Sequence, residues 1–179
     1  MSNLFMFGVR DLRGAPWLAT GSYGSLVDFV GVNQLQVRDR MQNATLEGDD
    51  VELATVAAAI GADITIRFAT THSTTIDVYS VLSGKMPTST SGGRRIGQGR
   101  GRFQYFGLIG QVMDEDDEAE HLIWIPKAKV VNGLSYEVAY GGFKIEDQTV
   151  QAVADGNLDA WYIYEHDPAT GIPATLPPT

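Results

Sequence analysis

The stretch DITIRFA, residues 63–69, alternates between apolar and polar side chains, and its pattern decides the fold class. Ile64, Ile66 and Phe68 fall on one face, and polar residues lie between them on the other. Successive side chains of a β-strand point to opposite faces of its sheet. The period of two therefore predicts a half-buried strand.

The same alternation recurs along the chain. Leu35 and Val37 alternate with Gln36 and Arg38. In segment 134–140, the large apolar residues alternate with Ser135, Glu137 and Ala139. Segment 103–113 reads as a long, bent strand, because Gly107 and Gly110 favour bulges or close backbone approach. Further strands are expected at His121–Val130, Val150–Ala154 and Ala160–Glu165.

One segment, Ser73–Gly84, has the helical period instead. Thr74 and Asp77 have the spacing of a capping box, and Gly84 can end the helix in a left-handed conformation. An apolar stripe on this segment is expected to pack into the core; it consists of Ile76, Tyr79 and Leu82. The sequence therefore predicts a mainly-β, mostly antiparallel fold with one short flanking helix.

Glycine and proline mark the irregular segments. Residues 15–23 and 86–101 are expected to be irregular, and so is the proline-bearing end of the chain. The length of 179 residues suits one domain, which is placed at residues 1–166. Residues 167–179 then form an extended arm or a disordered tail.

Composition excludes several kinds of chemistry. There is no cysteine, which excludes disulfides and thiolate sites, and the three histidines form no metal-binding pattern. No G-x-S-x-G elbow occurs, and the glycine-rich stretch 97–101 lacks the spacing and lysine of a phosphate-binding loop. We therefore expect no metal, no cofactor and no enzymatic activity.

The formal net charge is −9, with a calculated pI near 4.6. Such a chain binds nucleic acid poorly, because phosphate contacts need clustered cations. The charge suits ordinary solubility, or a surface along which DNA slides without sticking. No apolar run is long enough to span a bilayer, and the N-terminus does not have the pattern of a secretory signal. Folding in a cytoplasm is expected.

Two charged clusters are candidate contact sites. The arginines of the glycine-rich stretch fit a solvated loop, a subunit contact or a nucleic-acid arm; they are Arg94, Arg95, Arg100 and Arg102. The acidic run 114–120 fits a solvated hairpin tip or a contact with a basic patch on a neighbouring subunit. Its first residues are Asp114, Glu115, Asp116 and Asp117. The run lacks the spacing of a calcium loop.

Segment 27–85 resembles the core of the tail tube (major tail) proteins of long-tailed bacteriophages. The residues are VDFVGVNQLQVRDRMQNATLEGDDVELATVAAAIGADITIRFATTHSTTIDVYSVLSGK. The stretch 124–129, followed by 134–140 and 150–155, is similar to the C-terminal half of that family. The glycine- and arginine-rich loop at 92–102 and the proline-bearing C-terminus depart from its pattern.

The resemblance implies an antiparallel β-sandwich or barrel-like tail tube fold. It also implies that six subunits form a ring and that rings stack into the tail tube of the virion, which is assembled in the host cytoplasm. The partners would be copies of the chain and other tail proteins at the tube ends. DNA would pass through the lumen during ejection without specific binding, and no membrane is involved.

The resemblance further places a loop and strand entry at Leu46–Thr55, in contact with a neighbouring subunit or ring. The candidate contact residues there are Leu46, Glu47, Asp49, Asp50 and Glu52. Three alternatives stay open. They are a contractile-tail or secretion-system tube protein, a tail terminator or connector that forms a single ring, and a ligand-binding β-barrel or enzyme.

Overall fold

The computed structural model describes most of the chain. The described residues are 4–19, 22–48, 51–68, 76–97, 104–113, 120–131, 133–134, 136–139, 142–145, 147–154, 158–166 and 173–176.

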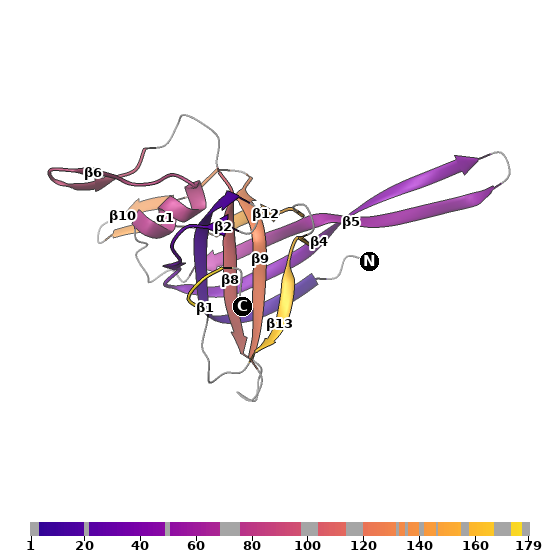
Figure 1. The fold of residues 1–179 in the computed structure, drawn as a ribbon, viewed down its shortest axis with the longest axis horizontal. Helices are drawn as coiled ribbons and strands as arrows, with labels where there is room; N and C mark the ends of the chain where they lie inside the picture. Colours follow the sequence, from indigo (N-terminus) through magenta and orange to yellow (C-terminus); the bar gives the residue numbers. More distant parts are fainter. Residues whose placement is uncertain are drawn as a thin grey trace.

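The body is one antiparallel sheet that closes on itself (Figure 1). Its closed path consists of β12 (Gln148–Ala152), β5 (Val51–Phe68), β4 (Val32–Gly48), β1 (Leu4–Ala19), β8 (Phe106–Met113) and β9 (Glu120–Val130). Strand β12 pairs with both β5 and β9, which closes the ring of strands. The first half of β9 pairs instead with β13 (Tyr162–His166). The short strands β2 (Ser22–Tyr23) and β3 (Val27–Asp28) pair with β1.

The core lies inside the closed sheet and follows the predicted alternation. Ile64 and Ile66 are fully buried, whereas Arg67 is exposed. Leu35 and Val37, opposite them on β4, are also buried. Strands β4 and β5 thus contribute alternate side chains to the interior here. The mainly-β, antiparallel prediction with one helix is confirmed for the described residues.

Helix α1 (Ile76–Ser83) covers one end of this core. Val78, Val81 and Leu82 are buried. The side chain of Val81 and the ring of Phe29 both lie next to Gly14. The predicted C-terminal glycine is confirmed, because Gly84 has a φ of 65° and directly follows the last helical residue. Residues 73–75, which include Thr74 of the expected capping box, lie outside the described residues.

Two segments expected to be irregular are ordered strands. Strand β1 continues to Ala19 and β2 begins at Ser22, so the prediction of irregular structure is wrong for residues 15–19 and 22–23. Pro16 is accommodated because its carbonyl accepts a hydrogen bond from the Gly24 N–H at 2.8 Å, and its own position needs no donor. The prediction of irregular structure is also wrong for part of segment 86–101, because β6 (Thr88–Thr90) and β7 (Gly93–Arg95) form a hairpin.

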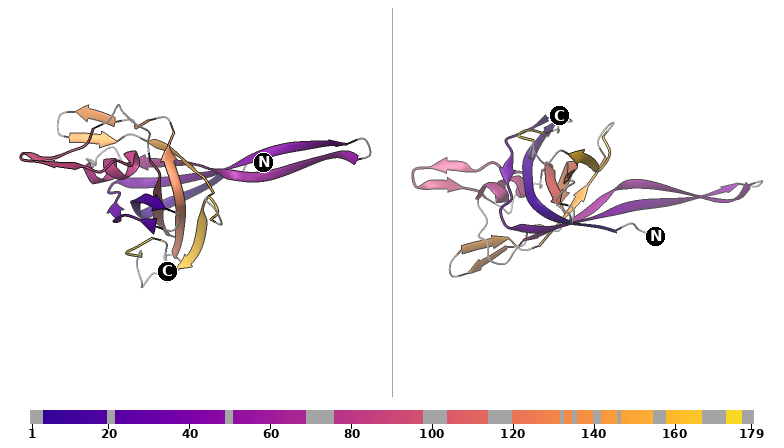
Figure 2. Two further views of the ribbon diagram at one scale, coloured as in Figure 1. Left: turned by 45° about the horizontal axis from the view of Figure 1, so that its top comes forward. Right: turned by 90° about the horizontal axis from the view of Figure 1, so that it is seen from below.

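Three two-stranded hairpins project from the body (Figures 1 and 2). The longest is the distal part of β4 and β5, and the others are β6–β7 and the pair β10 (Tyr136–Ala139) and β11 (Gly142–Ile145). The pairs β6–β7 and β10–β11 are each a separate sheet. Two strands alone bury too little surface to be stable in water. The hairpins are therefore the parts of this fold most in need of a partner.

Candidate functional site

The long hairpin leaves the body at a defined point. The β4–β5 register shifts between Arg40 and Met41, opposite Gly61. Gly61 has a φ of 150°, and a Cβ added there would lie 2.5 Å from the backbone oxygen of Ala152. Glycine is therefore required where β5 leaves its contact with β12. A bulge with a glycine bends a strand pair out of the sheet, which directs the hairpin away from the core.

Beyond that bulge the hairpin is a two-stranded ribbon. Pairing continues from Met41 and Ala59 to Gly48 and Val51. At about 3.3 Å per residue, the ribbon extends roughly 25 Å past the body. Among the described strands, β1 pairs with β4 only up to Arg38, so neither strand of the ribbon has a second neighbour there. Both edges carry unpaired backbone groups.

The candidate contact residues of segment 46–55 lie at the far end of this ribbon. The segment was predicted as a loop and strand entry, but the strands run through it, with Leu46 and Glu47 in β4 and Glu52 in β5. The loop prediction is therefore wrong for residues 46–48, which belong to β4, whereas residues 51–55 begin β5, as the predicted strand entry requires. Asp49 and Asp50 lie outside the described residues, as do the side chains of Leu46, Glu47 and Glu52.

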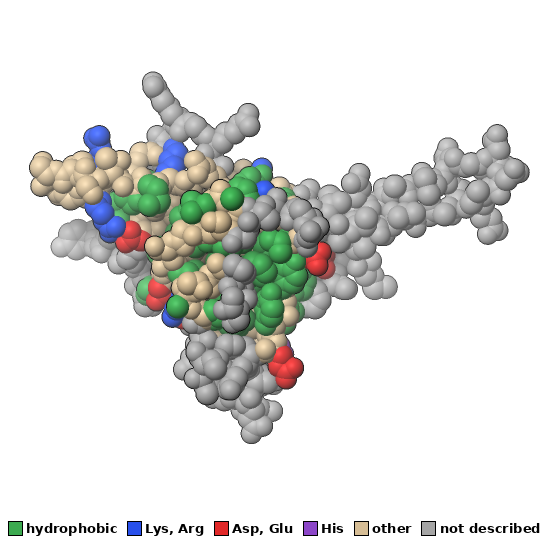
Figure 3. All heavy atoms as spheres, in the orientation of Figure 1, with side chains coloured by type: hydrophobic (Ala, Val, Ile, Leu, Met, Phe, Trp, Pro, Cys, Tyr) green, Lys and Arg blue, Asp and Glu red, His purple; other side chains and the backbone are tan. Residues whose placement is uncertain are grey.

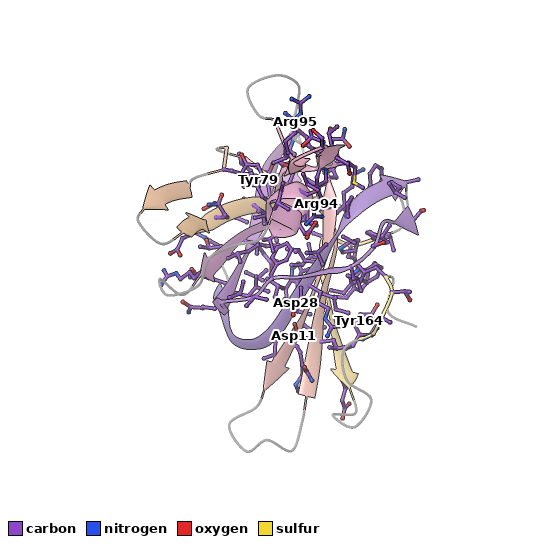
Figure 4. The ribbon with its side chains drawn as sticks, turned by 90° about the vertical axis from the view of Figure 1, so that its left-hand side faces the viewer. Asp11, Asp28, Tyr79, Arg94, Arg95 and Tyr164 are labelled. Carbon is purple, nitrogen blue, oxygen red and sulfur yellow. The ribbon has the colours of Figure 1, made fainter. Side chains whose placement is uncertain are left out.

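The arginine stretch begins on the β6–β7 hairpin, whose six strand residues are all exposed. The Arg94 guanidinium donates two hydrogen bonds to the Asp77 carboxylate, at 2.6 and 3.0 Å, and so fastens the hairpin to helix α1. Arg95 follows on the other side of the strand, and Figure 4 shows its side chain pointing away from the body. Arg100 and Arg102 lie outside the described residues. Of the arginines described in this stretch, Arg95 is the one presented outward.

The strength of the Arg94–Asp77 ion pair between β7 and helix α1 depends on pH. The hydrogen bond from Arg94 holds the pKa of the Asp77 carboxyl below 3.8, so the pair stabilises the fold above that pH and is lost as pH falls through the folded pKa. In Arg94→Gln, the Asp77 pKa is expected to move back toward 3.8 in an NMR titration. Arg95→Gln is the matched control and leaves it unchanged. Equal Asp77 pKa values in the two variants contradict this account.

The acidic run lies between β8 and β9. Met113 and Glu120 pair with each other and hold its two ends together at one end of the β8–β9 hairpin. Residues 114–119, which include the predicted contacts Asp114, Glu115, Asp116 and Asp117, lie outside the described residues. The position of the run between two paired strands agrees with the prediction of a hairpin connection.

The other end of the β8–β9 hairpin carries a cluster of aromatic and cationic side chains. The Lys127 ammonium lies 4.1 Å from the ring centroid of Trp17 and 4.7 Å from that of Tyr105. The Lys129 ammonium lies 5.5 Å from the Tyr105 ring. We call these four residues the lysine–aromatic cluster. Sequence reasoning did not assign it as a site, although the spacing of Lys127 and Lys129 on one strand is a signal that both point to the same face.

An aromatic surface covers the outer face of β9 and β13. Trp124 stacks on Tyr162 at 5.0 Å between ring centroids and lies 6.4 Å from Tyr164. Figure 3 shows apolar side chains gathered over these two strands. The Trp124 side chain is buried, and its indole N–H has no hydrogen-bond partner among the described residues. Burial, followed by the charge of Tyr162, raises the pKa of Tyr164.

Two carboxyls meet beside Arg13 on β1 (Figure 4). Arg13 donates to Asp11 at 2.9 Å, and Asp28 is its cross-strand neighbour. Burial raises the pKa of Asp28 above 3.8, and the charge and hydrogen bond of Asp11 raise it further, against the lowering effect of Arg13. The native state therefore holds this proton more tightly than the unfolded chain, and the resulting stability is lost as pH rises through the folded pKa.

Asp28→Asn is expected to raise the thermal unfolding temperature at neutral pH, because it removes an ionised carboxylate placed beside another. The gain should disappear below pH 3.8, where Asp28 is protonated in both states. Asp159→Asn makes the same charge change at an exposed position and serves as the control. A gain that persists unchanged into acid, or one that the control reproduces, contradicts the assignment.

An open pocket of about 620 Å³ lies between the β2–β3 region and the described C-terminal residues. It is lined by Tyr23, Gly24, Ser25, Leu26, Ala174, Thr175 and Leu176. Tyr23 donates its hydroxyl to the Pro126 carbonyl at 2.9 Å, so the phenol is already engaged. The lining offers no carboxylate or imidazole. Residues 167–172 and 177–179 of the expected C-terminal arm lie outside the described residues.

Comparison with protein-family models and with curated proteins found no match. Within the described residues, no group of histidine and carboxylate side chains is placed to hold a metal ion. None of the helices among those residues has the length and apolar character needed to cross a membrane.

Proposed function

We propose that this protein is a structural subunit that forms hexameric rings, and that the rings stack into a tail tube through which phage DNA is ejected. The observation that carries the proposal is the long β4–β5 ribbon. It extends roughly 25 Å beyond a closed body, at about 3.3 Å per residue, with both edges unpaired along its described length. An isolated ribbon of this kind is marginal in water, so its stability is best explained by contact with another subunit.

The rest of the fold supports an assembling subunit. The body is closed, so its central strands offer no edge to neighbours, and the backbone groups available for pairing are on the projecting hairpins and on β13. Such edges lead to uncontrolled aggregation unless a defined partner covers them. A subunit that contacts its neighbours through different surfaces can close into a ring and also stack into an open tube.

The resemblance of segment 27–85 to tail tube proteins supports a phage tail tube as the assembly that this subunit forms. The ribbon contains the segment that links successive rings in that family. With a net charge of −9 per subunit, a ring repels DNA from its lumen walls and lets it slide. Arg95 then belongs on the outer surface or at a subunit contact, away from the lumen. The virion is the corresponding location.

Asp49 and Asp50, which follow β4 and precede β5 in the sequence, provide a test. A carboxylate at a ring contact needs cationic or N–H partners, so replacing both aspartates with alanine removes charge-assisted hydrogen bonds across the contact. The double variant is expected to raise the concentration needed for assembly by about tenfold and to keep the circular dichroism spectrum of the wild type. Sedimentation velocity measures both species. Unaltered tube yield in the variant counts against this contact.

A further inference from the structure

The two ends of the β8–β9 hairpin carry opposite charge. One end is occupied by the connection 114–119, in which every residue except Ala119 is acidic. The other end carries the lysine–aromatic cluster of Trp17, Tyr105, Lys127 and Lys129. The pairing of Met113 with Glu120 and of Phe106 with Ala128 places these features at opposite ends of the same two strands (Figure 1).

The cluster is a preformed cationic surface. The Trp17 backbone N–H donates to the Tyr105 carbonyl at 3.0 Å, and the two rings meet edge to face with 5.8 Å between centroids. Contacts with the ring faces hold the lysine ammoniums in place. Less side-chain entropy is lost when an anion then binds them. No carboxylate of the described residues lies within ion-pair distance of Lys129.

The acidic connection cannot reach the cluster of its own subunit. The strands between the two ends span about 25 Å, at about 3.4 Å per residue. The pairing of Met113 with Glu120 holds both ends of the connection together, and a chain of this length can extend at most about 12 Å beyond them. Any contact between the acidic run and the cluster is therefore made between two copies of the chain.

We propose that the lysine–aromatic cluster of one subunit binds the acidic run 114–120 of a second copy, head to tail. A contact between opposite ends of the same element is heterologous, so it can repeat from copy to copy, and where its rotation does not close a ring it builds an open stack. This inference rests on the proposed tube and names the charged contact between its successive layers. Several copies of the contact in each ring act together, so a modest gain at each one gives a firm junction.

A charge-swap experiment tests the contact. One variant carries Lys127→Glu and Lys129→Glu. A second carries Glu115→Lys, Asp116→Lys, Asp117→Lys and Glu118→Lys, which leaves two acidic residues beside four basic ones in the run 114–120 and so reverses its charge. Each variant alone places like charges opposite one another and is expected to raise the critical concentration for assembly by at least about tenfold. A chain carrying both sets of changes, and an equimolar mixture of the two variants, restore opposite charges and should both assemble like the wild type.

Controls separate this contact from folding and from other charge effects. Lys129→Glu alone leaves Lys127 on Trp17 and tests the site if the double change disturbs folding, which thermal unfolding reports. Arg67→Glu reverses an exposed cation on the body part of β5, outside the cluster and the candidate contacts, and should leave the critical concentration unchanged. Assembly of the wild type should also weaken as salt rises, because exposed charge pairs are screened.

The outcomes distinguish the two claims. A wild-type chain that never assembles overturns the proposed function and this inference with it. A wild-type chain that assembles, beside lysine variants with the same critical concentration, overturns the inference alone. The same holds if the chain carrying both sets of changes stays as defective as its parents, or if the lysine variants lose only binding to a DNA oligonucleotide.

Discussion

Replacing Gly61 with valine is expected to lower the free energy of unfolding by about 3 kcal/mol. Two effects add at this position. A side chain strains a backbone whose φ is 150°, and its Cβ meets the carbonyl oxygen of Ala152, which belongs to the neighbouring strand β12 and cannot move freely. Urea unfolding followed by circular dichroism measures the loss.

Gly97→Ala is the matched control for this substitution. A Cβ at Gly97 meets no atom of the described residues within 4 Å, so the control is expected to change stability by less than about 0.5 kcal/mol. A Gly61→Val chain as stable as the control contradicts the assigned role of Gly61 as the point where the ribbon leaves the closed sheet. The comparison tests the fold without requiring any assembly.

Shortening the β4–β5 ribbon is expected to abolish assembly and leave the body folded. The variant removes residues 44–56 and joins Asn43 to Ala57, its pairing partner, through an Asn-Gly turn. The buried residues Leu35 and Ile66 lie on the body side of Gly61, so the core is retained. The free energy of unfolding should change by less than about 1 kcal/mol, whereas sedimentation should show a monomer at every concentration.

A second variant isolates the ribbon from its tip. It keeps the full ribbon and replaces only Asp49-Asp50 with the same Asn-Gly turn. This chain retains the unpaired edges and is expected to assemble, at a higher concentration than the wild type. Normal assembly of the shortened chain contradicts the proposed role of the ribbon, and loss of assembly in the turn variant alone assigns the contact to the two aspartates instead.

The sequence was sufficient for the elements that bury one face. Ile64 and Ile66 alternate with polar residues, and the structure buries them; Ser73–Gly84 contains the single described helix, which ends directly before Gly84. In these segments the spacing of the apolar residues matches the pattern of burial, because one face of the element packs on the core and the other faces outward. A helix often ends with a residue in the left-handed conformation, which glycine adopts without strain, so Gly84 marks the helix end independently of the rest of the fold.

Other elements escaped prediction for physical reasons. The segment around Pro16 was expected to be irregular because proline cannot donate to a strand neighbour, but an acceptor role for its carbonyl suffices there. Residues 57–59, the alanine-rich part of β5, lie in the projecting ribbon. They form a strand there because they pair with β4, and not because they are buried in the body. The β6–β7 hairpin is wholly polar and exposed, so no apolar period marks it.

The candidate contacts were predictable only as charged stretches. Sequence grouped Arg94 with Arg95, but the structure gives them different surroundings, because Arg94 reaches Asp77 on helix α1. Sequence also could not bring Trp17 and Tyr105 to Lys127, since these residues come from three different strands or their flanks. Pairing between strands distant in sequence creates such clusters, and no single segment encodes it.

Negative-stain electron microscopy of the purified chain, examined over a range of concentration and salt, tests the central claim most directly. The proposal predicts rings of six subunits and tubes formed by their stacking, with a continuous central channel, and monomers alone for the chain with the shortened ribbon. A wild-type protein that remains strictly monomeric at high concentration, or that forms only irregular aggregates without a channel, contradicts it.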